Sequence, residues 1–348
     1  MVNHNIFMQR CLQLAAMGQQ WVTPNPMVGA VVVKNGKIIG EGYHKEFGGP
    51  HAEVNAIEAV KDKTQLKGAT IYVSLEPCAH FGKTPPCTNL IIEHKITKVV
   101  IACLDPNPMV AGKGVKHLKS AGIELEAGVL EREAQELNKI FFWFHTQKQP
   151  YVVLKWAQTA DGFCGRIPNA KLSSKITNWY SNILVHKIRS AEAAILVGYN
   201  TALNDNPELT NRKWIGKNPL RIVLDLAGEL PQNLRLFNDE KQTIVFTLKP
   251  KENTQHVSYF KLNSTLNIVN EVLNALFELK IQSVMIEGGP KTLQLFIDKK
   301  VWNEAHIFTS SREWQKGIKA PIIKKDTKVY DKINLTDSYQ IFKPNYSL

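Results

Sequence analysis

The chain has 348 residues, a formal net charge of +12 and an apolar content of 44%. This length exceeds one typical core and favours two domains, and the apolar content is that of a globular protein. No apolar run approaches the roughly 18 residues that span a bilayer, and residues 1–21 lack the basic leader of a signal peptide. We therefore expect a cytoplasmic protein without a membrane partner.

The positive charge lies mainly in the second half of the chain, where the excess is +9, against +3 through residue 150. Such a bias suits nucleic acid, but it also suits small polyanions such as phosphorylated sugars and dinucleotides. The basic residues are scattered and are not interleaved with aromatic residues, unlike those of a nucleic-acid-binding face. We expect small phosphorylated partners and no nucleic acid.

The cysteines are odd in number and irregularly spaced: Cys11, Cys78, Cys87, Cys103 and Cys164. In a long chain without an export signal, this pattern argues against disulfides and favours metal binding or catalysis.

The first half of the chain is predicted to alternate between helix and strand. Apolar residues at helical spacing predict a helix over 6–17, and Asn35-Gly36 between apolar runs predicts a hairpin of strands 28–33 and 38–43. The further predictions are helices over 51–60, 87–94 and 130–144, a short helix after residue 114, and strands over 70–75, 98–104 and 123–127. This alternation indicates an α/β fold in which helices cover both faces of a sheet, in three layers.

The polar segment 145–150 interrupts the pattern, and we place the domain boundary there, with domains 1–147 and 148–348. The second half again alternates, with strands over 151–156, 194–197, 220–224, 243–248 and 283–286, and helices over 177–190, 266–279 and after Gly289.

One stretch carries a metal-site pattern: His51 and Glu53, then Cys78 and Cys87. One imidazole and two thiolates are the three protein ligands of a catalytic zinc site, which keeps a fourth position for water. Zinc lowers the pKa of bound water from about 15.7 to about 7. Glu53 is placed to carry a proton from that water to a departing amine, so the pattern predicts hydrolytic deamination at one zinc ion.

Two other interpretations use the same residues. A closed, non-catalytic zinc site would stabilise a binding protein, but the placement of Glu53 argues against it. A nucleic-acid-editing deaminase would use a basic C-terminal half to bind RNA. Its usual Pro-Cys-x-x-Cys spacing differs from the eight residues that separate Cys78 and Cys87 here.

That longer insert, residues 79–86, together with Thr23-Pro24-Asn25-Pro26-Met27-Val28-Gly29, resembles the deaminase half of the bifunctional riboflavin-biosynthesis deaminase/reductase family. The resemblance implies a cytidine-deaminase-like domain that removes the C2 amino group of 2,5-diamino-6-(5-phosphoribosylamino)pyrimidin-4-one. It also implies substrate contacts from Asn25, His44 and Lys83.

The second half lacks a GxGxxG fingerprint, but Glu287-Gly288-Gly289-Pro290-Lys291-Thr292 follows a predicted strand. Glycines there let a helix N-terminus approach a pyrophosphate, although an ordinary strand-to-helix turn would use the same residues. The stretches 155–162 and 197–212 are similar to the reductase half of the same family. The resemblance implies a dihydrofolate-reductase-like α/β domain in which NADPH reduces the ribosyl group of 5-amino-6-(5-phosphoribosylamino)uracil to ribityl.

The resemblance also assigns surfaces in this half. The implied NADPH surface is Ala157, Lys175, Thr201, Asp205, Gly289, Pro290, Lys291, Thr292, Leu293, Gln294 and Leu295. The implied substrate surface is Ser173, Arg189, Leu209, Arg212 and Glu287. Guanidinium groups pair bidentately with phosphate, and we expect Lys155 and Asp205 to be the titratable groups nearest the hydride transfer.

This chain departs from the family pattern at Lys175, where relatives usually have a Trp before Ile-Thr, and at Asn182, where an Arg is often found. Lys175 could supply a compensating charge. The resemblance further implies a homodimer.

Overall fold

The computed structural model describes residues 3–81, 85–108, 110–165, 175–237, 240–323, 327–334 and 337–345. The chain divides into two compact units, residues 1–148 and 149–348. In the described part of the chain, no helix combines the length and apolar character needed to cross a bilayer.

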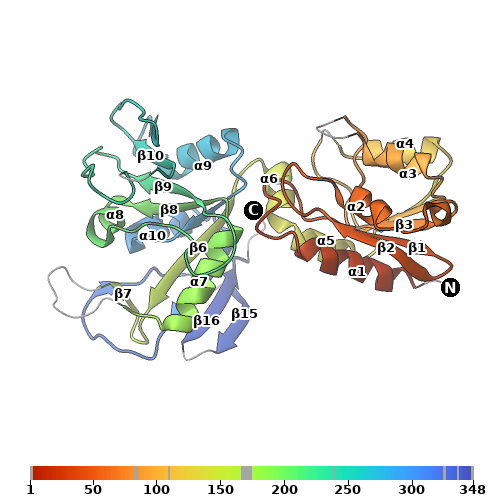
Figure 1. The fold of residues 1–348 in the computed structure, drawn as a ribbon. Coiled ribbons are helices and arrows are strands. Elements are labelled where there is room, and N and C mark those ends of the chain that lie inside the picture. Colours follow the sequence, from red (N-terminus) through yellow and green to blue (C-terminus); the bar gives the residue numbers. More distant parts are fainter. Residues whose placement is uncertain are drawn as a thin grey trace. The chain divides into compact units, whose positions relative to one another are not determined.

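The first unit is built on a sheet with the strand order β2-β1-β3-β4-β5 (Figure 1). Its strands are β1 (Gly29–Lys34), β2 (Lys37–Tyr43), β3 (Thr70–Val73), β4 (Lys98–Ile101) and β5 (Glu124–Ala127). The predicted hairpin is confirmed: Asn35 and Gly36, between β1 and β2, have φ of 51° and 74°, as a two-residue type I′ turn requires. Strands β3, β4 and β5 are parallel.

Helices cover both faces of this sheet. They are α1 (His4–Ala16), α2 (Ala52–Glu58), α3 (Cys87–Glu93), α4 (Lys113–Ser120), α5 (Glu131–Leu137), α6 (Lys139–Gln147) and a 3₁₀ turn (Lys63–Leu66). One core contains Ala56 of α2, Ile91 of α3 and Leu118 of α4. A second core contains Met8 of α1 and Phe141 of α6. Because alternate strand residues face opposite cores, the predicted three-layer α/β/α fold is confirmed.

The prediction of one helix over 130–144 is wrong, because the chain forms α5 and α6 with a break at Asn138. This residue is 3% exposed and has φ −105° and ψ 26°. Its side chain accepts a hydrogen bond from Met27 N at 2.8 Å and donates one to Met27 O at 2.9 Å. A partner 111 residues away therefore interrupts a locally continuous helical pattern.

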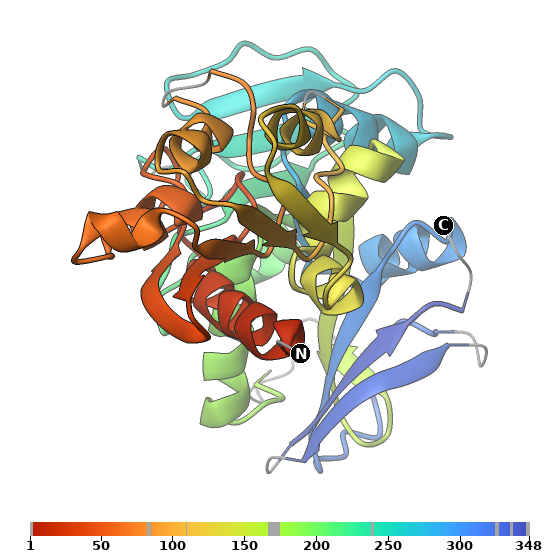
Figure 2. The same ribbon diagram turned by 90° about the vertical axis from the view of Figure 1, so that its right-hand side faces the viewer.

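The second unit has a sheet with the order β11-β10-β9-β8-β12-β6-β13-β16-β15. Its strands are β6 (Tyr151–Gln158), β8 (Ala194–Gly198), β9 (Leu220–Leu224), β10 (Thr243–Thr247), β11 (Val257–Lys261), β12 (Ser283–Ile286), β13 (Glu304–Thr309), β15 (Lys328–Asn334) and β16 (Ser338–Lys343). The strands from β11 to β13 are parallel, whereas β16 runs antiparallel to β13 and β15. The last two strands are blue in Figure 2. A separate pair joins β7 (Phe163–Gly165) and β14 (Ile318–Lys319).

Helices also cover both faces of the second sheet. They are α7 (Trp179–Ala191), α8 (Tyr199–Asp205), α9 (Ile268–Glu278) and α10 (Pro290–Asp298). On one face, α9 and α10 pack Leu273 and Phe296 against the parallel strands. On the other, α7 packs Val185 against Phe308 and Tyr339. The predicted α/β class is confirmed, while β7, β11, α8 and every element after α10 were not predicted.

The Asn138 bonds generate a local stability prediction. In Asn138→Ala, the amide and carbonyl of Met27 lose these hydrogen bonds, each of which contributes about 0.5–1.5 kcal/mol. We expect faster hydrogen exchange of the Met27 amide and of neighbouring β1, measured by mass spectrometry on the full chain. Exposed Gln135 of α5 offers the control Gln135→Ala, which should leave these amides unchanged. Equal exchange in the two variants would refute the role of Asn138.

Candidate active sites

The first candidate site gathers around the carboxyl end of β3. His51 immediately precedes α2, Cys78 follows β3 by five residues, and Cys87 is the first residue of α3. Strand β2 ends at Tyr43, opposite Gly29, and Ala30 is opposite Val73 at the end of β3. The register therefore brings the segments that carry His51 and Cys78 to the same end of the sheet.

The three predicted ligands form a cluster with the dimensions of a zinc site. His51 Nδ1 lies 3.6 Å from Cys78 Sγ and 3.3 Å from Cys87 Sγ, and the three donor atoms all lie within 4.8 Å of one another. Zn–S bonds of about 2.3 Å and Zn–N bonds of about 2.0 Å at tetrahedral angles imply N···S distances of about 3.5 Å. The donor set and its spacing both fit zinc.

The donor atoms of this cluster shift one another's pKa values. The pKa of Cys78 is lowered to about 4, because Cys87 and then His51 hydrogen bond to its sulfur. The pKa of His51 is raised to about 9 by its hydrogen bond with Cys78. A zinc ion would bind the thiolate form of each cysteine and the neutral form of the imidazole.

Glu53 lies in the first turn of α2, two residues after His51, and is only 3% exposed. Burial raises the pKa of its carboxyl to about 7, which places the group near the pH at which it can both accept and return a proton.

Two of the three predicted substrate residues of this site contact each other. Nδ1 of His44 donates to Pro50 O at 3.0 Å, because a carbonyl can only accept, and Nε2 then accepts from Asn25 Nδ2 at 3.0 Å. Burial lowers the pKa of His44, which favours this neutral tautomer. Its ring also meets that of His51 edge-on at 5.5 Å. Lys83, the third residue, lies outside the described residues.

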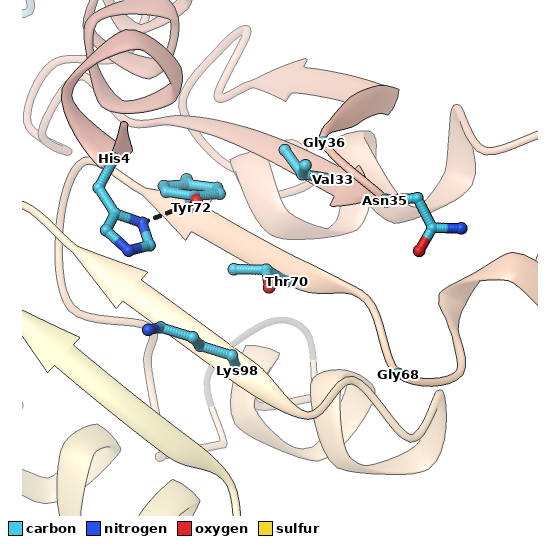
Figure 3. A pocket seen from close by; sticks show the side chains of 8 residues that line it. All are labelled: His4, Val33, Asn35, Gly36, Gly68, Thr70, Tyr72 and Lys98. Atoms are coloured by element: carbon cyan, nitrogen blue, oxygen red, sulfur yellow. Dashed lines mark hydrogen bonds between the residues drawn. The ribbon is translucent and has the colours of Figure 1, made fainter. Parts of the chain in front are cut away.

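A surface pocket of about 470 Å³ in the same unit is separate from this cluster (Figure 3). Its lining includes His4, Thr70, Tyr72 and Lys98. Thr70 and Lys98 are the first residues of β3 and β4, whereas Cys78 follows the end of β3. The pocket therefore opens at the other end of the sheet and is not the zinc site.

The second candidate site lies at the carboxyl ends of the parallel strands β8 and β12 and beside Lys155 within the neighbouring strand β6. Glu287, directly after β12, accepts from Lys155 Nζ of β6 at 2.9 Å and from Arg189 Nη2 and Nε of α7 at 2.7 Å each. The three side chains are 7–13% exposed. Burial disfavours the charge on Glu287, but Arg189 and Lys155 overcome this effect and lower its pKa to about 2.

A second arginine lies nearer the surface. Arg212 Nη1 donates to Glu208 Oε2 at 2.6 Å and to Thr210 Oγ1 at 2.7 Å, and its side chain is 49% exposed. Thr210 O also accepts from Arg189 Nη1 at 3.1 Å, so one short segment links both arginines. Leu209 in that segment is buried and has φ 51°, a conformation uncommon for a residue other than glycine.

The predicted cofactor turn is closely packed. Gly289 has φ 72° and precedes α10. A side chain on Gly288 would lie 2.6 Å from Thr201 of α8, and one on Gly198 would collide with Thr292. The turn therefore requires glycine at 288 and 289, and Gly198 at the end of β8 leaves room for Thr292. The amides of the turn lie at the N-terminus of α10, where a pyrophosphate could bind. No role was predicted for Gly198, although it lies inside the stretch 197–212 that is similar to the reductase half of the family.

The remaining predicted residues of this half lie on several elements. Ala157 is in β6, and Asp205 is the last residue of α8 and is exposed. Residues 290–295 form the first turns of α10, where Leu293 is buried in the core. Lys175 O accepts from Arg312 at 2.8 Å, and Ser173 lies outside the described residues.

Comparison with known proteins covers both units. Residues 1–103 match the cytidine and deoxycytidylate deaminase zinc-binding region, and residues 150–312 match the RibD C-terminal domain. The chain is 44% identical to the riboflavin biosynthesis protein RibD of Aquifex aeolicus, over 90% of this chain and 88% of the relative. It is 39% identical to RibD of Actinobacillus pleuropneumoniae, over 88% and 83%.

Solved structures agree with these relatives. A diaminohydroxyphosphoribosylaminopyrimidine deaminase/5-amino-6-(5-phosphoribosylamino)uracil reductase from Thermotoga maritima superposes with a TM-score of 0.88 at 40% identity, covering 98% of both chains. Acinetobacter baumannii RibD superposes with a TM-score of 0.89 at 32% identity, again over 98% of both.

The ion pairs of Glu287 generate a stability prediction. Because its pKa is lowered from 4.5 to about 2, its ionisation stabilises the fold above about pH 4.5, and this contribution is lost as the pH falls towards 2. Glu287→Gln should therefore lower the stability of the intact protein by about 3 kcal/mol at pH 7. The difference from wild type should shrink below pH 4.5, measured by urea unfolding at several pH values.

Glu229 offers a matched control, since its ion pair with Lys249 is 62–63% exposed and such pairs contribute about 0–1 kcal/mol. Glu229→Gln should change the urea midpoint little at any pH. A Glu287→Gln effect that did not depend on pH would rule out the ionised, paired carboxylate.

Proposed function

Since the chain belongs to the RibD family of riboflavin biosynthesis proteins, we propose that its two units divide that family's deaminase and reductase reactions at the residues described above. Residues 1–147 deaminate 2,5-diamino-6-(5-phosphoribosylamino)pyrimidin-4-one at C2. Residues 148–348 reduce the ribosyl group of the resulting 5-amino-6-(5-phosphoribosylamino)uracil with NADPH.

The observation that carries this proposal is the convergence of His51, Cys78 and Cys87 within 4.8 Å, beside a buried Glu53. Zinc held by these three residues supplies the Lewis acidity that makes water a nucleophile near neutral pH. A disulfide or a purely structural metal site would not require a buried carboxylic acid beside these three residues.

Glu53 carries the protons of the deamination. Its carboxylate accepts a proton from the attacking water and passes it to the ring nitrogen beside C2. It then carries the remaining hydroxyl proton to the amine, which leaves as ammonia as the C2 carbonyl forms. A pKa of about 7 suits both steps, because the group is then neither a very weak base nor a very weak acid. Asn25 lies beside this site through its bond to His44 and contacts the substrate ring.

Lys155 supplies the proton of the reduction. NADPH bound along Thr201 and the Gly289 turn supplies the hydride. The ribosyl group that accepts this hydride also takes up one proton. Glu287 holds the Lys155 ammonium at the strand ends, whereas Asp205 is exposed at the end of α8. We therefore assign the proton transfer to Lys155 and a place on the cofactor surface to Asp205.

The phosphate of the substrate requires a cation near this site. Arg212 is half exposed and contacts Thr210, while Arg189 is largely engaged by Glu287. We assign the phosphate to Arg212 and the orientation of Glu287 to Arg189. A homodimer and a cytoplasmic location are further predictions from the family resemblance and from the sequence.

Glu53→Gln tests the deaminase assignment. The amide cannot shuttle a proton, so we expect stoichiometric zinc and a loss of ammonia release by at least about 100-fold. The same protein should still oxidise NADPH when supplied with the deaminated uracil. Retention of zinc with a near wild-type rate of ammonia release would exclude the proton-shuttle role.

Lys155→Met tests the reductase assignment. The variant removes the proton donor but leaves the Arg189–Glu287 pair, so we expect NADPH oxidation to fall by about 100-fold or more while ammonia release is unchanged. Lys261 is exposed at the end of β11, and Lys261→Met should leave both rates unchanged. A Lys155→Met rate within a few-fold of wild type would assign the proton to another group.

A further inference from the structure

Glu76 is a buried acidic residue that the mechanism above does not use. It is 4% exposed and lies between β3 and the ligand Cys78, two residues before the cysteine. Its backbone N–H donates to Cys103 O at 3.0 Å, which continues the sheet contact past the end of β3. A buried carboxylate requires hydrogen-bond or charged partners. The partners of Glu76 therefore indicate its role.

Among the described residues, three backbone N–H groups from one later segment donate to the Glu76 carboxylate. Oε2 accepts from Gly112 N at 3.0 Å and from Asp105 N at 3.3 Å, and Oε1 accepts from Val115 N at 3.0 Å. Gly112 is the N-cap of α4 and has no side chain to cap the helix. Glu76 therefore caps α4 from another part of the chain, where a negative charge is favoured.

The first turns of α4 contact the cysteine segments directly as well. A side chain on Gly114 would collide with Pro77 O, so the helix lies against the backbone just before Cys78. Thr88, the residue after Cys87, donates from Oγ1 to Cys78 O at 3.2 Å and lies 3.0 Å from His117 Nδ1 of α4. Both cysteine segments are therefore held by the same helix.

The geometry points to Glu76 as a positioning residue that sets the place of Cys78 relative to Cys87 and thereby the coordination geometry of the zinc ion. Its carboxylate anchors the segment Glu76-Pro77-Cys78 to α4, and α4 in turn holds Thr88 next to the other cysteine. This inference rests on the proposed zinc site and assigns Glu76 no contact with substrate. Outer partners of metal ligands usually contribute 10–100-fold to metal affinity or activity.

The test compares Glu76→Gln with wild type in the full chain. The amide keeps one acceptor oxygen but turns an N–H₂ towards a backbone donor and removes the negative charge, so the anchor is weakened without a change of size. We expect zinc affinity to fall by about 10–100-fold, measured by competition with a chromophoric chelator. We also expect the absorption bands of the cobalt(II)-substituted protein to shift at saturating metal. A role in stability alone would leave the saturated cobalt spectrum unchanged, and that result would overturn the inference.

Two further variants complete the experiment. Glu41→Gln removes a partly exposed ion pair with Arg10 in the same unit and should change neither affinity nor spectrum. Thr88→Val keeps the shape of the side chain but removes its bond to Cys78 O, and it should shift the cobalt bands in the same direction. If Glu76→Gln does not fold, the cobalt spectrum of Thr88→Val tests the inference instead. A spectrum of Thr88→Val identical to that of wild type would contradict it. Absence of zinc binding by the wild-type chain would instead refute the proposed site itself.

Discussion

Both candidate sites depend on the same constraint, that strands running in the same direction bring their carboxyl ends to one edge of a sheet. In the first unit, the segments after β3 and β4 carry Cys78 and Asp105, and Glu76 joins them. In the second unit, β6, β8 and β12 lie side by side. Gly198 ends β8, Glu287 follows β12, and Lys155 lies inside β6, directly after the Leu154 that pairs with Ile286 at the end of β12. Residues far apart in the sequence thus come together near the strand ends, where side chains no longer pack within the sheet.

Two buried glutamates show how the environment separates their roles. Burial raises the pKa of Glu53 to about 7, which suits the proton transfer proposed for it. At Glu287, Arg189 and Lys155 reverse the effect of burial and lower the pKa to about 2, so the group stays charged and holds its partners in place. The same type of side chain therefore has a raised pKa in one unit and a lowered pKa in the other.

The predictions from the sequence succeeded where the signal is local. The spacing of His51, Glu53, Cys78 and Cys87 identified a cluster that the fold brings together, and Asn35-Gly36 identified a hairpin. The predictions failed where the local structure depends on hydrogen bonds to residues far away in the sequence. Asn138 breaks a helical pattern through a residue 111 positions away, and Glu76 bonds to groups 29–39 positions later, which no spacing could indicate.

In the second unit, contacts between distant residues were likewise not predicted from the sequence. The resemblance pointed to Lys155, Arg189 and Glu287 one by one, but not to their mutual pairing across 98 and 132 residues. The strands after α10 have no strong period or turn motif and were not predicted.

If one chain first deaminates the diaminopyrimidine and then reduces its product, the two reactions must occur in that order. This order is measured by following ammonia and NADPH together after the zinc-loaded protein is mixed with the diaminopyrimidine substrate. We expect ammonia to appear first, NADPH oxidation to follow after a lag, and one NADPH to be consumed per ammonia released at completion. Oxidation of NADPH before or without release of ammonia would contradict it.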